Sequence, residues 1–185
     1  TGIGYARAMR RKQIFIATSS VGPGSTNMVT AAAVALSNRL PILLLPGDTF
    51  ASRFPDPALQ QVENFHSPTS TQNDSLKAVS KYFDRITRPE QILFSLPQAL
   101  QMMLDQADCG PATISMSQDV QGEAFDYPEI FFEEQIHEIR RIYPDQNQIK
   151  NATEVIKNSK QPIIISGGGV LYSEAEKELS EFAKK

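Results

Sequence analysis

Short apolar runs alternate with longer segments of mixed polarity along the chain. Residues 13–18 (QIFIAT) and 41–48 (PILLLPGD) are rich in aliphatic and β-branched side chains, which is typical of buried strands. The second run is apolar on both faces, and this favours a parallel sheet covered by helices. We expect further strands at the end of 74–87, over 110–120 and over 161–170.

Helical segments separate these strands. The segment 25–37 has many small side chains that allow close packing on a sheet, and 88–108 carries Pro97, which should kink that helix or split it in two. Further helices are expected over 2–11, at the start of 74–87, over 147–159 and over 173–185. The alternation predicts an α/β fold, a mostly parallel sheet with helices on both faces, followed by the start of a second α/β domain.

The remaining segments suggest how the chain is divided. Residues 49–74 are polar and interrupted by prolines, and loops of this length are usually functional or part of an interface. We expect a first domain over 1–125, a linker over 126–145 and a second unit over 146–185 that is too small to form its own core. The opening residues resemble the middle of a helix, so we expect an internal fragment of a longer protein.

Composition narrows the functional classes. The net charge is −3 and the pI near 5.4, which argues against nucleic-acid or membrane-surface partners held by bulk electrostatics. The single cysteine, Cys109, rules out an intramolecular disulfide and fits a reducing compartment. No apolar run approaches transmembrane length and no signal peptide is recognisable, so a cytoplasmic location is expected.

Two glycine turns follow predicted strands. In VGPGSTN the glycines Gly22 and Gly24 precede a helix, so an anion or a planar ring could approach the backbone there. The turn is neither a Walker loop nor a G-x-G-x-x-G fingerprint, and a tight strand–helix turn without a ligand is the alternative. SGGGV over 166–170 follows the same logic with a weaker signal.

Other reactive side chains are isolated in the sequence. His66 and His137 lack neighbours at metal-ligand spacing, Cys109 has no local base, and no G-x-S-x-G elbow is present. Three carboxylates of the 41–74 region could include an acid–base pair, although spacing alone does not establish one: Asp48, Asp56 and Glu63. The residues by themselves therefore indicate an α/β ligand-binding fragment without a defined reaction.

The order of the motifs adds a family resemblance. The run from GYARAM to LLLPGD, then GPATISMSQDVQ, then QPIIISGGGV, resembles the thiamine-diphosphate-dependent enzymes of the acetohydroxyacid synthase superfamily. The resemblance covers nearly the whole chain. It implies a pyrimidine-binding domain lacking its N-terminal part over 1–125 and the beginning of a central domain over 146–185.

Within the superfamily, GDTF with PDPALQQVE and SQDVQGEAFDYP is similar to the ring-opening hydrolases of myo-inositol catabolism. The function implied for the parent is hydrolysis of a C–C bond in a cyclic trihydroxy-1,2-dione. An acetohydroxyacid synthase or 2-oxoacid decarboxylase fragment is one alternative. A non-catalytic nucleotide-binding or assembly module that uses the SGGGV turn is another.

The resemblance also implies a site. Gly22, Pro23, Gly24 and Asn27 match the turn that packs against the aminopyrimidine of thiamine diphosphate, and the cleft candidates are Asp48, Thr49, Phe50 and Arg53. The activating glutamate is expected upstream of the chain, so no catalytic residue and no metal ligand is assigned within it. The parent is expected to bind thiamine diphosphate, Mg²⁺ and a small-molecule substrate as a homo-oligomer, dimer or tetramer, whereas the fragment itself is expected to be inactive.

Overall fold

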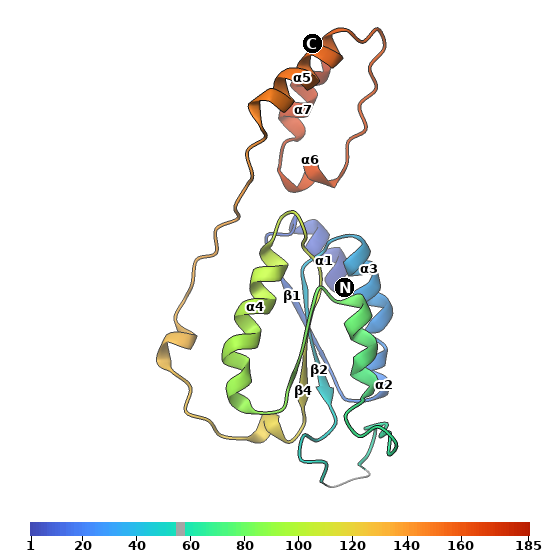
Figure 1. Ribbon diagram of the computed structural model, residues 1–185, viewed down its shortest axis with the longest axis vertical. Coiled ribbons are helices and arrows are strands. Elements are labelled where there is room, and N and C mark those ends of the chain that lie inside the picture. The colour runs from blue at the N-terminus through green and yellow to red at the C-terminus, as the bar shows by residue number, and fades with distance from the viewer. Residues whose placement is uncertain (55–57) are drawn as a thin grey trace. The chain divides into compact units, whose positions relative to one another are not determined.

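The computed structural model describes residues 1–54 and 58–185 (Figure 1). The chain forms two compact units, Thr1–Ile139 and Arg140–Lys185, and each is described by itself. The division falls inside the segment 126–145 that the sequence suggests as a linker. None of the helices in the described ranges combines the length and the apolar character needed to cross a lipid bilayer.

The first unit is built on a four-stranded sheet in the order β1-β2-β4-β3. All three strand pairs are parallel, with Ala17 opposite Leu44 and Leu44 opposite Thr113 in the central register. The central strands β2 and β4 are buried on both faces because each has a neighbour on either side and helices above and below. The strands are β1 (Phe15–Ser19), β2 (Ile42–Asp48), β3 (Tyr82–Ile86) and β4 (Ala112–Ser117).

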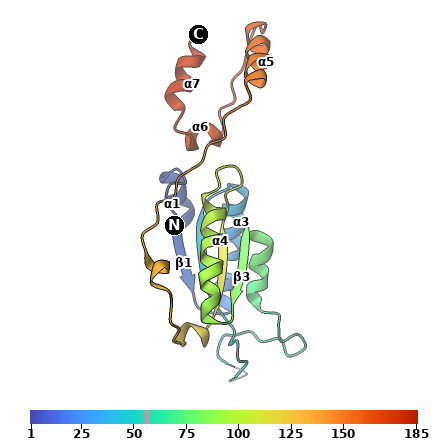
Figure 2. The same ribbon diagram turned by 60° about the vertical axis from the view of Figure 1, so that its left-hand side comes forward.

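Helices cover both faces of this sheet, as expected (Figures 1 and 2). On one face α4 (Ile92–Leu104) packs on β3 and β4, while α3 (Val29–Ser37) and the 3₁₀ helix η1 (Gln72–Val79) pack together on the other. Below α4 lies a core of Leu43, Ile86, Ala99, Met103, Ala112, Ile114 and Val120. The short elements of this unit are α1 (Gly2–Ala8), α2 (Pro23–Thr26), η2 (Pro89–Gln91), η3 (Val120–Gly122) and η4 (Glu129–Phe132).

Two helices differ in detail from the sequence expectation. The helix expected over 25–37 begins earlier, at Pro23, and is interrupted after Thr26, so that it forms α2 and α3. Proline at the first helical position suits that start. In contrast, α4 is a single helix and is not split at Pro97. Pro97 lies on the exposed face, where water can hydrate the carbonyl that loses its intrahelical partner.

The second unit contains α5 (Gln146–Lys157), α6 (Gly168–Tyr172) and α7 (Glu176–Ala183). Asp145 caps α5 by accepting hydrogen bonds from the N–H groups of Asn147 and Gln148. The prediction of a strand over 161–170 is wrong. The first residues of this segment have no regular structure, and its end forms α6. A strand needs a partner, and the described part of this unit offers none, so Ile163 and Ile165 stay exposed.

Candidate functional site

The candidate site lies where the parallel strands β1, β2 and β4 end. In open α/β sheets ligands bind at this edge, outside the carboxyl ends of the strands. Three segments emerge from it: the glycine turn after β1, the long loop after β2, and the turn that contains Asp119 after β4. Hydrogen bonds join the loop after β2 to the turn after β4.

The glycine turn packs against the long loop of the same chain. Gly22 has a φ of +72°, and a Cβ built on it would lie 1.8 Å from the carbonyl oxygen of Gln60. The glycine is therefore required by a left-handed backbone and by the close approach of the loop. Gly22 is buried and Gly24 half-buried, whereas Pro23 and Asn27 are exposed. Of the predicted cofactor-facing residues, these last two are the most accessible.

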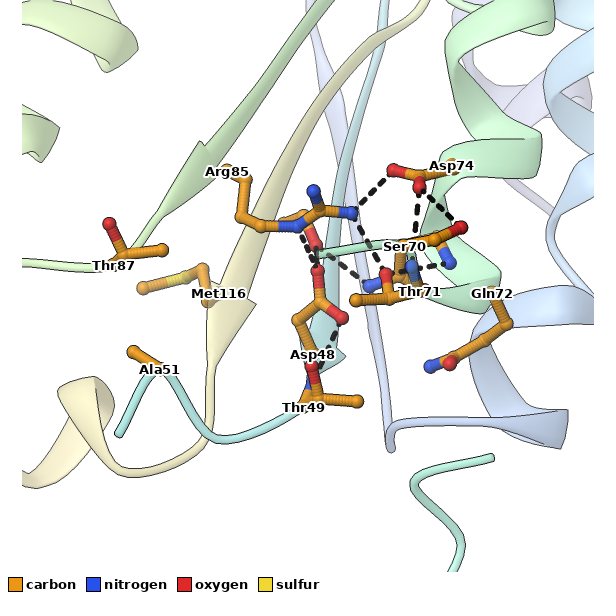
Figure 3. A network of polar contacts seen from close by, with 12 residues as sticks. Asp48, Thr49, Ala51, Ser70, Thr71, Gln72, Asp74, Arg85, Thr87 and Met116 are labelled. Carbon is orange, nitrogen blue, oxygen red and sulfur yellow. Dashed lines mark hydrogen bonds and ion pairs between the residues drawn. The ribbon is translucent and has the colours of Figure 1, made fainter. Parts of the chain in front are cut away.

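Asp48 lies at the end of β2 and its side chain is fully buried (Figure 3). The Nε of Arg85 donates to Asp48 Oδ2 at 2.7 Å, and the hydroxyl of Ser115 donates to the same oxygen. The N–H of Thr49 donates to Oδ1 at 2.8 Å. Asp48 thus differs from the expectation that it faces a cleft, because its carboxylate is turned inward to an arginine supplied by β3.

The same arginine links the sheet to the start of η1 (Figure 3). Its Nη2 donates to Asp74 Oδ1 at 2.5 Å and to the hydroxyl of Thr71 at 2.8 Å. Burial opposes ionisation of Asp74, but the hydrogen bonds from Arg85 and Lys77 outweigh it and lower the pKa of this carboxyl. Burial likewise opposes the charge on Arg85, yet its two carboxylate partners raise the guanidinium pKa. Asp74 and Arg85 are therefore both charged at neutral pH.

Asn73 completes this polar network from within η1. Its side-chain nitrogen donates to the carbonyl of Gly47 at 2.9 Å and to the hydroxyl of Ser115 at 2.7 Å. These bonds join η1 to both β2 and β4. As a result, the point at which the chain leaves β2 is held by side chains from three other elements.

Asp119 holds the next part of the loop. Its two carboxylate oxygens accept the N–H groups of Ala51 and Ser52, each at 2.9 Å. Partial burial raises the pKa of Asp119, but the backbone hydrogen bonds outweigh it and the pKa lies below the ordinary value. Sequence reasoning missed both Asp119 and Arg85. The only signal for them in the sequence is that Arg85 is a charged residue within a predicted strand and Asp119 a charged residue near the end of another.

A cavity of about 140 Å³ opens beside this anchored loop. From the segment just after β2 it is lined by Thr49, Phe50 and Arg53, three of the four predicted cleft residues. The rest of its lining comes from later in the same loop: Gln61, Glu63, Asn64, Phe65, Pro68 and Ser70. The long polar segment thus forms a concave surface, and the functional role of these residues remains a prediction.

The remaining candidates lie apart from the cavity or are occupied by other contacts. Glu63 Oε1 accepts the N–H of Ala58 at 2.7 Å, and Asp56 lies outside the described residues. Cys109 is buried, its thiol donates to the carbonyl of Met103, and burial raises its pKa to about 11. His66 and His137 are exposed. Within the described ranges no three His, Cys, Asp or Glu side chains are grouped as a metal site.

Comparison with known proteins adds independent information. Residues 149–185 match the family described as "Thiamine pyrophosphate enzyme, central domain". Over 94% of its length the chain superimposes on 31% of the thiamine diphosphate-dependent 4-hydroxybenzoylformate decarboxylase of Rhodococcus jostii RHA1, with a TM-score of 0.73. The sequence identity of 17% means that this likeness supports the fold alone, and it confirms the predicted α/β class.

The sequence relatives are closer. The chain is 52% identical over its full length to the 3D-(3,5/4)-trihydroxycyclohexane-1,2-dione hydrolase of Clostridium tetani. It is 54% identical to the proteins of that name from Halalkalibacterium halodurans and Bacillus velezensis, over 100% and 95% of its length. It spans 28 to 29% of the length of these relatives. The chain is therefore similar throughout to one segment of these hydrolases, and the resemblance to thiamine-diphosphate-dependent enzymes is confirmed.

Proposed function

We propose that the full-length protein containing this chain is a thiamine-diphosphate-dependent hydrolase that cleaves a C–C bond of a cyclic trihydroxy-1,2-dione in myo-inositol degradation. The observation that carries this proposal is identity above 50% over the whole chain to proteins named for that reaction. The aligned region spans all 185 residues and so includes the long loop after β2.

The residues of the glycine turn fit the cofactor in part. Gly22 is covered by the carbonyl of Gln60, so we assign no cofactor contact to it. Pro23 and Asn27 are exposed beside Gly24, and we place the aminopyrimidine against this side of the turn. When bound, thiamine diphosphate supplies the carbanion chemistry that C–C cleavage next to a carbonyl requires.

The chain itself contributes positioning. Asp48 and Asp119 hold the backbone at Thr49, Ala51 and Ser52, so the loop that lines the cavity leaves the sheet in one direction. A cavity whose wall is held in this way orients a substrate with little loss of entropy at the moment of reaction. We assign no acid–base residue within the chain.

Several finer points of the proposal rest on the family resemblance. We propose that Mg²⁺ and the diphosphate are held by residues outside this chain. We also propose that the parent acts in the cytoplasm as a homo-oligomer, a dimer or tetramer, so that the pyrimidine-binding domain meets the cofactor at a subunit interface.

The test is an assay of the full-length protein with thiamine diphosphate and Mg²⁺. The expected product is a ring-opened acid, formed by adding one water molecule across the broken C–C bond. Its appearance is measured by NMR. Pyruvate serves as the comparison substrate. Turnover of pyruvate with no change in the dione would contradict the proposal and favour an acetohydroxyacid synthase or a 2-oxoacid decarboxylase.

A further inference from the structure

A side chain from another element holds the glycine turn after β1. Gln72 lies in the first turn of η1 and is half-buried (Figure 3). In the orientation that satisfies both of its neighbours, its amide oxygen accepts the N–H of Gly22 at 2.8 Å. Its amide nitrogen then donates to the carbonyl of Gln61 at 2.9 Å. One amide therefore joins the glycine turn to the long loop after β2.

The two partners allow this amide only one orientation. A carbonyl accepts and an N–H donates, so the carbonyl of Gln61 takes the amide nitrogen and leaves the amide oxygen for Gly22. Gly22 is buried, and a buried donor is costly to leave unpaired. Gln72 thus supplies an acceptor to a residue whose backbone is already in the left-handed region.

The other side of Gly22 is held from within the turn. Its carbonyl accepts the hydroxyl of Ser25 at 2.9 Å, and it accepts both the hydroxyl and the N–H of Thr26 at 3.0 Å. Because the N–H and the carbonyl of Gly22 are both paired, the peptide groups before and after this residue have fixed directions. The direction in which the chain enters α2 at Pro23 follows from them.

The backbone on which Gln72 stands is itself tied to the sheet. The hydroxyl of Thr71 accepts the N–H of Asn73 at 3.2 Å, and Asp74 Oδ2 accepts the N–H of Thr71 at the same distance. The side chain of Asn73 bonds to β2 and β4, and Thr71 and Asp74 bond to Arg85 of β3. A group supported in this way can hold another part of a site in a defined position.

We propose that Gln72 is a positioning residue for the cofactor, because its amide keeps the glycine turn in the conformation that meets the aminopyrimidine of thiamine diphosphate. This inference rests on the proposed function, which places that ring against the side of the turn formed by Pro23, Gly24 and Asn27. Gln72 acts through the backbone of Gly22.

The test compares Gln72→Met with wild type in the full-length protein. Methionine has nearly the same length, but it lacks the amide donor and offers only a weak acceptor. The Kd for thiamine diphosphate in the presence of Mg²⁺, measured by calorimetric titration, should rise at least about tenfold.

Steady-state kinetics adds a second measurement on the same variant. At saturating cofactor, kcat for the dione should fall at least about tenfold while KM changes less than about threefold. The KM should be preserved because the loop that lines the cavity keeps its anchors at Asp48 and Asp119.

The matched control is Gln98→Met, which changes an exposed glutamine of α4 and should bind cofactor and turn over the dione as wild type does. Hydrogen exchange of the peptide that contains Gly22, followed by mass spectrometry, reports on the hydrogen bond itself. Exchange should be faster in Gln72→Met than in wild type and unchanged in Gln98→Met.

Cofactor affinity and turnover separate this inference from the proposed function. If the full-length protein does not hydrolyse the dione, the proposed function fails, while weaker cofactor binding by Gln72→Met still supports the positioning role. If the dione is hydrolysed and Gln72→Met binds thiamine diphosphate as wild type does, the positioning role is overturned and the proposed function stands. Absence of thiamine diphosphate binding to the wild type would overturn both.

A purely structural role of Gln72 would give a different pattern. Gln72→Met would then lower the midpoint of urea unfolding and raise KM for the dione with unchanged cofactor affinity, and this result also overturns the inference. If Gln72→Met does not fold, Gln72→Ala decides, because water can hydrate the N–H of Gly22 and the carbonyl of Gln61 without fixing their separation. Wild-type cofactor affinity in Gln72→Ala would then reject the positioning role.

Discussion

The guanidinium of Arg85 on β3 lies 2.7 Å from the buried carboxylate of Asp48 at the end of β2 (Figure 3). The two strands are not neighbours, because β4 runs between them. In the β3–β4 register Arg85 stands opposite Ser115, whose small hydroxyl side chain also donates to Asp48. A larger residue at Ser115 would occupy the space that this ion pair crosses.

Removal of the arginine charge should destabilise the fold. Arg85→Met leaves the carboxylate of Asp48 buried without its cation, and we expect a loss of about 3–5 kcal/mol in the free energy of unfolding. Urea denaturation of the full-length protein, followed by circular dichroism, measures it. The control is Arg88→Met, which removes an exposed, solvent-screened pair with Glu90 and should leave the free energy of unfolding nearly unchanged. Equal effects of the two substitutions would contradict the role given to Arg85.

Replacement of Gly22 should also destabilise the protein. In Gly22→Ala the added Cβ enters a left-handed backbone and the space of the Gln60 carbonyl, so the loop must shift. We expect a loss of about 2–4 kcal/mol. Gly4→Ala is the matched control, since nothing lies within 4 Å of its Cβ position and alanine favours the helix α1. If Gly22→Ala unfolded at the wild-type urea concentration, the close approach of the loop would be disproved.

Stability should fall in acid through two carboxylates. The pKa values of Asp74 and Asp119 are lower in the folded protein than their ordinary value of 3.8, so both bind protons more readily after unfolding. Their contribution is complete above about pH 5 and is lost as the pH falls through 3.8 toward the lowered folded values. Thermal unfolding between pH 3 and 6 should be less dependent on pH in Asp119→Asn than in wild type. An identical pH profile would refute this.

Cys109 should be unreactive in the native protein. Burial raises the pKa of its thiol to about 11, so almost none is thiolate at pH 8. We expect no reaction with Ellman's reagent before unfolding and one equivalent for this cysteine in guanidinium chloride. Rapid native labelling of Cys109, located by mass spectrometry, would show that α4 and β4 do not enclose it.

The local pattern of apolar and polar residues predicted much of the secondary structure of the first unit. Apolar residues on both faces of 41–48 predicted a buried strand of a parallel sheet, and β2 is buried in that way. The glycine–proline–glycine sequence predicted the turn between β1 and the following helix. These features depend on backbone preferences and on burial averaged over a few neighbouring residues, which the order of amino acids contains directly.

The tertiary structure decided what each polar residue faces. Asp48 reads as a cleft residue in sequence, but the arginine 37 positions later turns it inward, and Asp119 reaches a loop 68 positions earlier. In the second unit, QPIIIS has the composition of a strand but remains unpaired. Strand pairing and ion pairing both need a partner that is distant in the chain. The local sequence therefore indicates which residues are able to pair. Only the folded arrangement determines the partner of each.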